Sequence, residues 1–249
     1  HTHKTVTCKK KFRFTQDTVF DIIVAAILSI IILIMAYPIY FVLMASFSDP
    51  SYVNNGSMLL WPKGFTLLGY QKVFEDSRIW TGYGNTLIYT IGGTALGTFF
   101  TMMAGYALSR RDLPFRNLLM AYFVFTMYFG GGLVPYYMVL KGIHMLNTFW
   151  VFIFPLMMSV YNMILVRSYV ESMPESLFEA AKIDGATDLT VFFRLVLPLA
   201  KPILMTIGLF VAVNQWNSWF DAYLYTSSQS LKPMQSVLVE ILNQYQTGG

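Results

Sequence analysis

The chain has 249 residues, of which 55% are hydrophobic and only 12% are charged. A soluble globular domain carries about 25% charged residues, so this composition excludes an ordinary soluble domain and indicates a lipid bilayer as the solvent. The net charge of +4 is dispersed near the ends of apolar stretches, without a stacking platform, which argues against a nucleic-acid partner. Cys8 is the single cysteine and the three histidines lack ligand spacing, so no internal disulfide and no metal site are expected.

Five stretches are long and apolar enough to span a bilayer, which requires roughly 20 mostly apolar residues. We predict an all-α, multi-pass membrane protein with spans at about 19–47, 83–108, 118–140, 148–170 and 202–225. Residues 1–18 are predicted to form a basic tail, and residues 19–249 a single transmembrane domain.

Small residues mark two places inside these spans. Gly93 and Gly97, four residues apart, favour close helix packing in the second span. The triplet 130–132 of three glycines, followed by Pro135, is expected to break or kink the third span.

The distribution of basic residues predicts the orientation in the membrane. Twelve of the 17 lysines and arginines fall on one side of the predicted spans, and the positive-inside rule makes that side cytoplasmic. These twelve are Lys4, Lys9, Lys10, Lys11, Arg13, Arg110, Arg111, Arg116, Arg167, Lys182, Arg194 and Lys201. Five spans from a cytoplasmic N-terminus leave the C-terminus outside, so we expect a sixth span beyond Gly249.

The connection at about 171–201 is a polar insert between the fourth and fifth spans. Pro174 suits the first position of a short helix, and Asp184-Gly185 predicts a turn in which glycine ends that helix in the left-handed conformation. Thr187 can then cap a second short helix, which Pro198 and Pro202 interrupt before the next span. Taken on this pattern alone, an amphipathic hairpin on the membrane surface is the favoured interpretation.

The complete string ESLFEAAKIDGATDLTVFFRLVLPLAKP (175–202) resembles the cytoplasmic loop of permease subunits in binding-protein-dependent ABC importers. In that family, Glu-Ala-Ala is followed after three residues by Gly, after nine more by Ile, and then, one residue later, by Leu-Pro. Most of these positions match in this chain, and Leu195 replaces the isoleucine by a residue of similar volume. The matching positions are Glu179, Ala180, Ala181, Gly185, Leu197 and Pro198. Asp184 and Ala186 match the form usual in carbohydrate permeases similar to the maltose importer's second membrane subunit.

The resemblance implies a fold, a mechanism and partners. The fold would be that of a type I ABC importer permease, and the loop would dock into a cleft of a cytoplasmic ATPase. The docking residues implied are Glu179, Ala180, Ala181, Asp184, Gly185, Ala186, Leu195, Leu197 and Pro198. The implied partners are a second homologous permease, two copies of the ATPase and an extracytoplasmic solute-binding protein, for which the outer loop at 48–82 is a reasonable surface. The location would be the plasma membrane of a prokaryote.

Other stretches, YFGGGLVPYYMVLKGIHMLNTFWVFIFP above all, resemble permeases for oligosaccharides or polysaccharide fragments. The segment VNQWNSWFDAYLY combines amides with flat aromatic rings, a combination that holds sugars. It makes Asn214, Gln215, Trp216, Asn217, Trp219 and Tyr223 candidates for a substrate path, and an aromatic interface belt is the equally weighted alternative.

The sequence thus predicts a carbohydrate permease that is not itself an enzyme. There is no phosphate-binding loop with its lysine, so ATP is expected to bind only to the partner, and no cofactor is expected. The first four spans have no charged residue in their cores, which argues against ion-coupled transport. An importer of the same architecture for a peptide, phosphate or polyamine, or a stand-alone channel or membrane scaffold, remain as alternatives.

Overall fold

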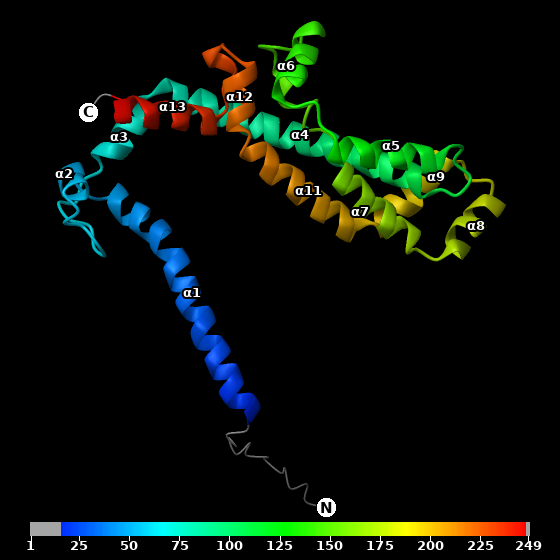
Figure 1. Cartoon of the computed structure of the whole chain (residues 1–249), viewed down its shortest axis with the longest axis horizontal. Coiled ribbons are helices and arrows are strands. Elements are labelled where there is room, and N and C mark those ends of the chain that lie inside the picture. Colours follow the sequence, from blue (N-terminus) through cyan, green and yellow to red (C-terminus); the bar gives the residue numbers. More distant parts are fainter. Residues whose placement is uncertain (1–15, 248–249) are drawn as a thin grey trace, which may run out of the picture. The chain divides into compact units, whose positions relative to one another are not determined.

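Every regular element in residues 16–247, the part of the chain that the computed structural model describes, is a helix (Figure 1). This confirms the predicted all-α class. The helices form two compact units, His1–Glu75 and Asp76–Gly249. The basic residues predicted for the N-terminal tail, Lys4 to Arg13, lie outside the described residues.

The first unit contains α1 (Gln16–Ser46), α2 (Pro50–Asn54) and α3 (Leu68–Glu75). Val19–Ser46 in α1 is long and apolar enough to cross a membrane, and its side chains are exposed along almost the whole length. Two tyrosines near the end of α1 hold the following loop, since Tyr37 donates a hydrogen bond to the Leu59 carbonyl and Tyr40 donates one to the Leu60 carbonyl.

The second unit is organised around α4 (Ser77–Ser109), which packs against α11, α7 and α13 (Figure 1). Its elements after α4 are α5 (Arg116–Tyr128), α6 (Leu133–Gly142), η1 (Phe149–Phe152), α7 (Val160–Glu171), α8 (Glu175–Ile183), α9 (Asp188–Val191), η2 (Phe192–Val196), α10 (Leu197–Leu199), α11 (Lys201–Trp216), α12 (Trp219–Tyr225), η3 (Gln229–Leu231) and α13 (Met234–Thr247).

Glycines on one stripe of α4 let the neighbouring helices approach closely. A Cβ atom added at Gly93 would lie 2.3 Å from Gln215 Nε2, and one at Gly97 would lie 3.0 Å from the Met157 carbonyl oxygen. At Gly105 the same atom would lie 2.5 Å from Cγ1 of Val166 in α7. The predicted packing role of Gly93 and Gly97 is therefore confirmed, and Gly105 extends the stripe.

Three of the predicted spans are not single straight helices. The third breaks at the glycine triplet into α5 and α6, which meet at 116°, as the glycines predicted. The fourth contains the short 3₁₀ helix η1, a run of turns around Pro155 and only then α7, because proline cannot donate a helical hydrogen bond. The fifth ends at Trp216, where the Asn217 side chain donates to the Val213 carbonyl at 2.8 Å.

The predicted number of five spans stays a prediction. Within the described residues, two helices are long and apolar enough to cross a membrane, and up to four spans result if each bent pair counts as one. The second bent pair joins residues 188–199 to α11 at 83°, with the fully buried Ala200 at the bend.

Candidate coupling site

The hairpin formed by α8 and α9 follows the local chemistry of its sequence. At the end of α8, the Gly185 amide donates to the Lys182 carbonyl at 3.0 Å, and the Ala186 amide donates to the Ala181 carbonyl at 2.9 Å. These are the two hydrogen bonds of a Schellman motif, and Gly185 has the left-handed φ of +73° that the motif requires. The predicted turn is confirmed.

The second half of the hairpin also begins as predicted. Thr187 caps α9, because its hydroxyl accepts a hydrogen bond from the Thr190 amide at 3.4 Å. Pro174, predicted at the first helical position, is the N-cap residue of α8, so this helix begins at Glu175, one residue later than predicted. Beyond α9, the Leu197 amide donates to the Phe192 carbonyl five residues back, so the chain forms the π-helical turn η2 directly before Pro198.

The apolar side of the hairpin is buried in the protein. Phe178 in α8 and Val191, Phe192 and Val196 after it form one core cluster with residues of α4 and α7, among them Tyr106. Ala181, Ala186, Leu195 and Leu197 pack against this cluster from its edge, while Pro198 is exposed. A hairpin whose apolar side already has protein partners does not need the membrane surface to cover it.

The opposite side of α8 is exposed and nearly free of bulky side chains. Ser176, Ala180 and Ile183 recur at intervals of four and three residues, which places them on one helical stripe, and all three are exposed. Ile183 is 86% exposed, the highest value among the large apolar side chains reported for this protein. Glu179, Asp184 and Gly185 are exposed beside the stripe.

Ile183 is not in the predicted docking set, although the interval of four and three residues from Ser176 and Ala180 marks it in the sequence. The predicted docking set is thereby divided by the structure. Its exposed members are Glu179, Ala180, Asp184, Gly185 and Pro198, and its partly buried members are Ala181, Ala186, Leu195 and Leu197. The partly buried members hold the hairpin to the helix bundle.

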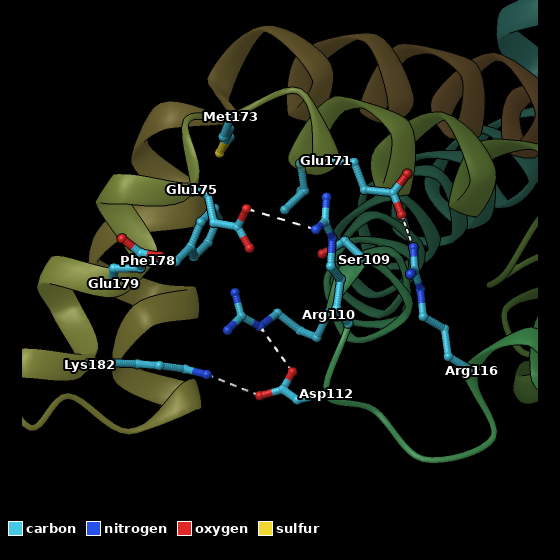
Figure 2. A pocket seen from close by; sticks show the side chains of 12 residues that line it. Ser109, Arg110, Asp112, Arg116, Glu171, Met173, Glu175, Phe178, Glu179 and Lys182 are labelled. Carbon is cyan, nitrogen blue, oxygen red and sulfur yellow. Dashed lines mark hydrogen bonds and ion pairs between the residues drawn. The ribbon is translucent and has the colours of Figure 1, made fainter.

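A polar cavity of about 660 Å³ lies between α8 and the loop that joins α4 to α5 (Figure 2). It is lined by four basic and four acidic side chains, and all four basic ones pair with three of the acidic ones, Asp112, Glu171 and Glu175. Lys182 Nζ lies 3.1 Å from Asp112 Oδ2, Arg110 Nε lies 3.7 Å from Asp112 Oδ1, and Arg116 pairs with Glu171.

Asp112 is the acidic centre of this cavity. The hydrogen bond that Lys182 donates lowers the pKa of the Asp112 carboxyl below its ordinary value of 3.8. A carboxyl with a depressed pKa stabilises the fold above its ordinary pKa and loses that contribution as the pH falls through the lowered value. Asp112 is therefore ionised at neutral pH, as the ion pair with Lys182 requires.

The candidate substrate-path residues do not converge on one surface. Gln215 is 1% exposed and faces Gly93, and neither its amide nitrogen nor its amide oxygen has a hydrogen-bond partner. Trp216 is partly buried and meets the Tyr83 ring edge-on at 6.1 Å. The remaining candidates, Asn214, Asn217, Trp219 and Tyr223, are exposed. A role of this set in substrate binding stays a prediction.

Comparison with known proteins agrees with the geometry of the hairpin and bundle. Residues 11–248 match the family described as "Binding-protein-dependent transport system inner membrane component". The polygalacturonan/rhamnogalacturonan transport system permease protein YtcP of Bacillus subtilis (strain 168) is 36% identical over 91% of this chain and 79% of its own length. Protein LplC of the same organism is 35% identical over 90% of this chain and 76% of its own.

A solved structure is similar over nearly the same range. It is the crystal structure of a bacterial ABC transporter involved in the import of the acidic polysaccharide alginate, with a TM-score of 0.87 and 32% sequence identity. The similarity covers 92% of this chain and 82% of the other. The chain thus belongs to the family of inner membrane components of binding-protein-dependent transport systems.

Proposed function

We propose that this chain is the permease subunit of an ATP-driven importer that moves a carbohydrate, an oligosaccharide or polysaccharide fragment, into the cytoplasm. The α8–α9 hairpin is the observation that carries the proposal. One side of the hairpin is anchored in the core of α4 and α7, and the other presents the low-bulk stripe of Ser176, Ala180 and Ile183 to a partner. A helix that presents small residues beside one exposed apolar side chain fits into an apolar groove of another protein.

The partner at the hairpin is a cytoplasmic ATPase, present in two copies. The second copy engages the equivalent hairpin of a second, homologous permease, and an extracytoplasmic binding protein delivers the solute. Closure of the ATPases around ATP moves both hairpins, and the permeases exchange inward-facing and outward-facing states. The clustering of lysine and arginine near the hairpin supports a cytoplasmic location for it and for the N-terminus.

The substrate class is inferred from relatives rather than from a pocket. YtcP is a polygalacturonan/rhamnogalacturonan permease, and the structural neighbour imports alginate. Arabinooligosaccharide permeases AraQ from two organisms are more distant, at 24–27% identity. Fragments of an acidic polysaccharide are therefore the first substrates to test.

The decisive experiment reconstitutes the complete importer in proteoliposomes and measures ATP hydrolysis and uptake with the binding protein loaded from a panel. The panel holds fragments of polygalacturonan and alginate, an arabino-oligosaccharide, a peptide, phosphate and a polyamine. Stimulation by a carbohydrate alone supports the proposal. Stimulation by phosphate, peptide or polyamine instead identifies an importer of the same architecture for another solute, and a chain that retains no ATPase identifies a different class of membrane protein.

A further inference from the structure

The loop that joins α4 to α5, residues 110–115, contacts the side of α8 that faces away from the exposed stripe. Its residues Arg110 and Asp112 meet Phe178 and Lys182 of α8, and these four residues are called the clamp. Lys182 Nζ is 3.1 Å from Asp112 Oδ2, and the Arg110 guanidinium carbon is 4.9 Å from the centre of the Phe178 ring. Figure 2 shows Arg110 between Phe178 and Asp112.

The clamp restrains α8 against rolling about its own axis. Phe178 and Lys182 are four residues apart, so they lie on one face of α8 and grip the loop at two successive turns. Arg110 is also 5.9 Å from the centre of the Tyr106 ring in α4, and its side chain is only 18% exposed. The guanidinium thus bridges an aromatic ring of α8 and one of α4, where shielding from water strengthens both contacts.

The loop itself is fixed at both ends. Arg110 is the C-cap residue of α4, and its amide donates to the Ala107 carbonyl. Arg116 at the start of α5 donates to the Leu108 carbonyl at 2.8 Å and pairs with Glu171 at the end of α7. Arg167 pairs with the same carboxylate at 2.9 Å. A loop held in this way transmits displacement instead of absorbing it.

We propose that the clamp is a positioning device that makes α8 and α4 move as one rigid body when the ATPases close. The proposal rests on the proposed function, because it assigns α8 the docking role. Without the contacts of Arg110 and Asp112, α8 would be joined to the bundle by the packing of Phe178 and Ala181 and by the short connections at 172–174 and 184–187, and a push on Ile183 would turn α8 in place. With the clamp, the push reaches α4, on which α7, α11 and α13 are packed.

The test measures the separation of α8 and α4 in the complete importer in lipid nanodiscs. Cys8 is replaced by serine, and spin labels are placed on cysteines at Leu177 in α8 and Phe100 in α4, which lie outside the clamp. We expect the label separation to agree within about 2 Å, the scale of ordinary helix shifts, between the nucleotide-free state and the state trapped with Mg·ATP and vanadate. A larger change of the label separation in the importer with the unsubstituted clamp would overturn the proposal.

Charge reversal tests the clamp directly. Asp112→Lys places a third positive charge beside Arg110 and Lys182 and is expected to broaden the distance distribution and to shift the label separation between the two nucleotide states by more than about 2 Å. Lys182→Asp in the same chain recreates an ion pair with exchanged signs while Arg110 stays beside the new lysine, and it is expected to narrow the distribution again in part. A single reversal without effect, or a double variant that assembles without restoration, contradicts the assigned role.

Arg111→Gln is the matched control in the same loop. Arg111 lies 3.9 Å from Glu175 with both side chains mostly exposed, and such solvated pairs contribute little. The control is expected to keep the narrow distribution. Retention of the ATPase by the unsubstituted chain is measured on the same preparation: its absence refutes the proposed function, whereas the effect of Asp112→Lys on the α8–α4 separation still reports on the clamp.

Discussion

At the residue scale, Ile183 is the side chain on which docking is most directly tested. An apolar side chain that is 86% exposed contributes little to the fold of this chain, so its replacement acts on a partner. Ile183→Asp is expected to lower the affinity for the ATPase about thirtyfold, which corresponds to about 2 kcal/mol, the threshold for an interface hot spot. The measurement is co-purification at graded ATPase concentrations.

Leu177→Asp supplies the control for Ile183→Asp. Leu177 lies on the same helix, is less exposed and stands off the stripe of Ser176, Ala180 and Ile183, so the same chemical change is made away from the proposed contact. We expect ATPase binding to stay within about threefold of the unsubstituted chain. Equal losses in both variants would mean that the stripe is not the docking surface.

A glycine can occupy the turn at position 185 for two reasons, the left-handed backbone conformation or the lack of room for a side chain against the ATPase. The φ of +73° at Gly185 strains any other residue, but no heavy atom lies within 4 Å of an added Cβ, so the chain itself leaves room for a side chain. Alanine adds little bulk and strains the turn by about 1–2 kcal/mol. Asparagine adopts the left-handed conformation more readily and adds more bulk.

If the ATPase wall lies against Gly185, Gly185→Asn is expected to impair ATPase binding more than Gly185→Ala does, although Gly185→Ala lowers the thermal stability more. Binding assays and thermal unfolding of both variants decide the question. If Gly185→Ala instead impairs ATPase binding more than Gly185→Asn does, the conformation of the turn alone matters, and the cleft of the ATPase does not contact this residue.

At the element scale, the glycine stripe of α4 determines how closely its neighbours pack. A Cβ at Gly105 would lie 2.5 Å and 2.6 Å from the Cγ1 and Cβ atoms of the β-branched Val166, which cannot turn aside. Gly105→Ala is therefore expected to destabilise the second unit by about 1–3 kcal/mol, the usual cost of overpacking. Thermal unfolding in detergent measures the change.

Gly84→Ala on the same helix is the control for Gly105→Ala. Gly84 has no neighbour within 4 Å of an added Cβ, so alanine there is expected to leave the stability unchanged or to raise it by up to about 1 kcal/mol through helix propensity. Equal shifts of the melting temperature in the two variants would contradict the close approach of α4 and α7 at Gly105.

Elements defined by neighbouring residues were predictable from the sequence, and elements defined by distant contacts were not. The Gly185 turn and the Thr187 cap depend on hydrogen bonds between residues at most five positions apart. Glycine and threonine at these positions indicate such local hydrogen bonds. The break at the glycine triplet is equally local. Lys182 pairs with Asp112, which is 70 positions away in the sequence. Leu195 and Leu197 pack against a cluster that includes Met102 and Tyr106 of α4. No local sequence pattern indicates contacts between residues so far apart.

At the scale of the whole molecule, the orientation in the membrane decides whether the hairpin can meet a cytoplasmic ATPase. With Cys8 replaced by serine, single cysteines are placed at Ser57, in the predicted outer loop, and at Leu177, in the hairpin; both positions are exposed. We expect a membrane-impermeant maleimide to label position 57 in intact cells and position 177 only after permeabilisation, because the basic residues flank the hairpin.

The unsubstituted chain, in which Cys8 is the single cysteine, supplies a third position for the same labelling, and Cys8 is expected to react only after permeabilisation. Labelling of position 177 in intact cells would place the hairpin outside and would remove the basis for both proposals. The membrane class was predictable from hydropathy, whereas the side of the basic loops and the number of spans stay predictions. The turns at 153–159 and the bend at Ala200 were not predictable from hydropathy, since they depend on backbone hydrogen bonding.

The bend at Ala200 has a mechanical consequence. Ala200 is fully buried between Pro198 and Pro202, so the arm at 188–199 and α11 are fixed at 83° to each other. The 16 residues of α11 make an arm of about 24 Å at 1.5 Å per residue, and a tilt of about 10° at its foot displaces the far end by about 4 Å. A tilt of α11 that is too small to disturb the packing beside Ala200 therefore produces a larger displacement at Trp216, where the helix ends.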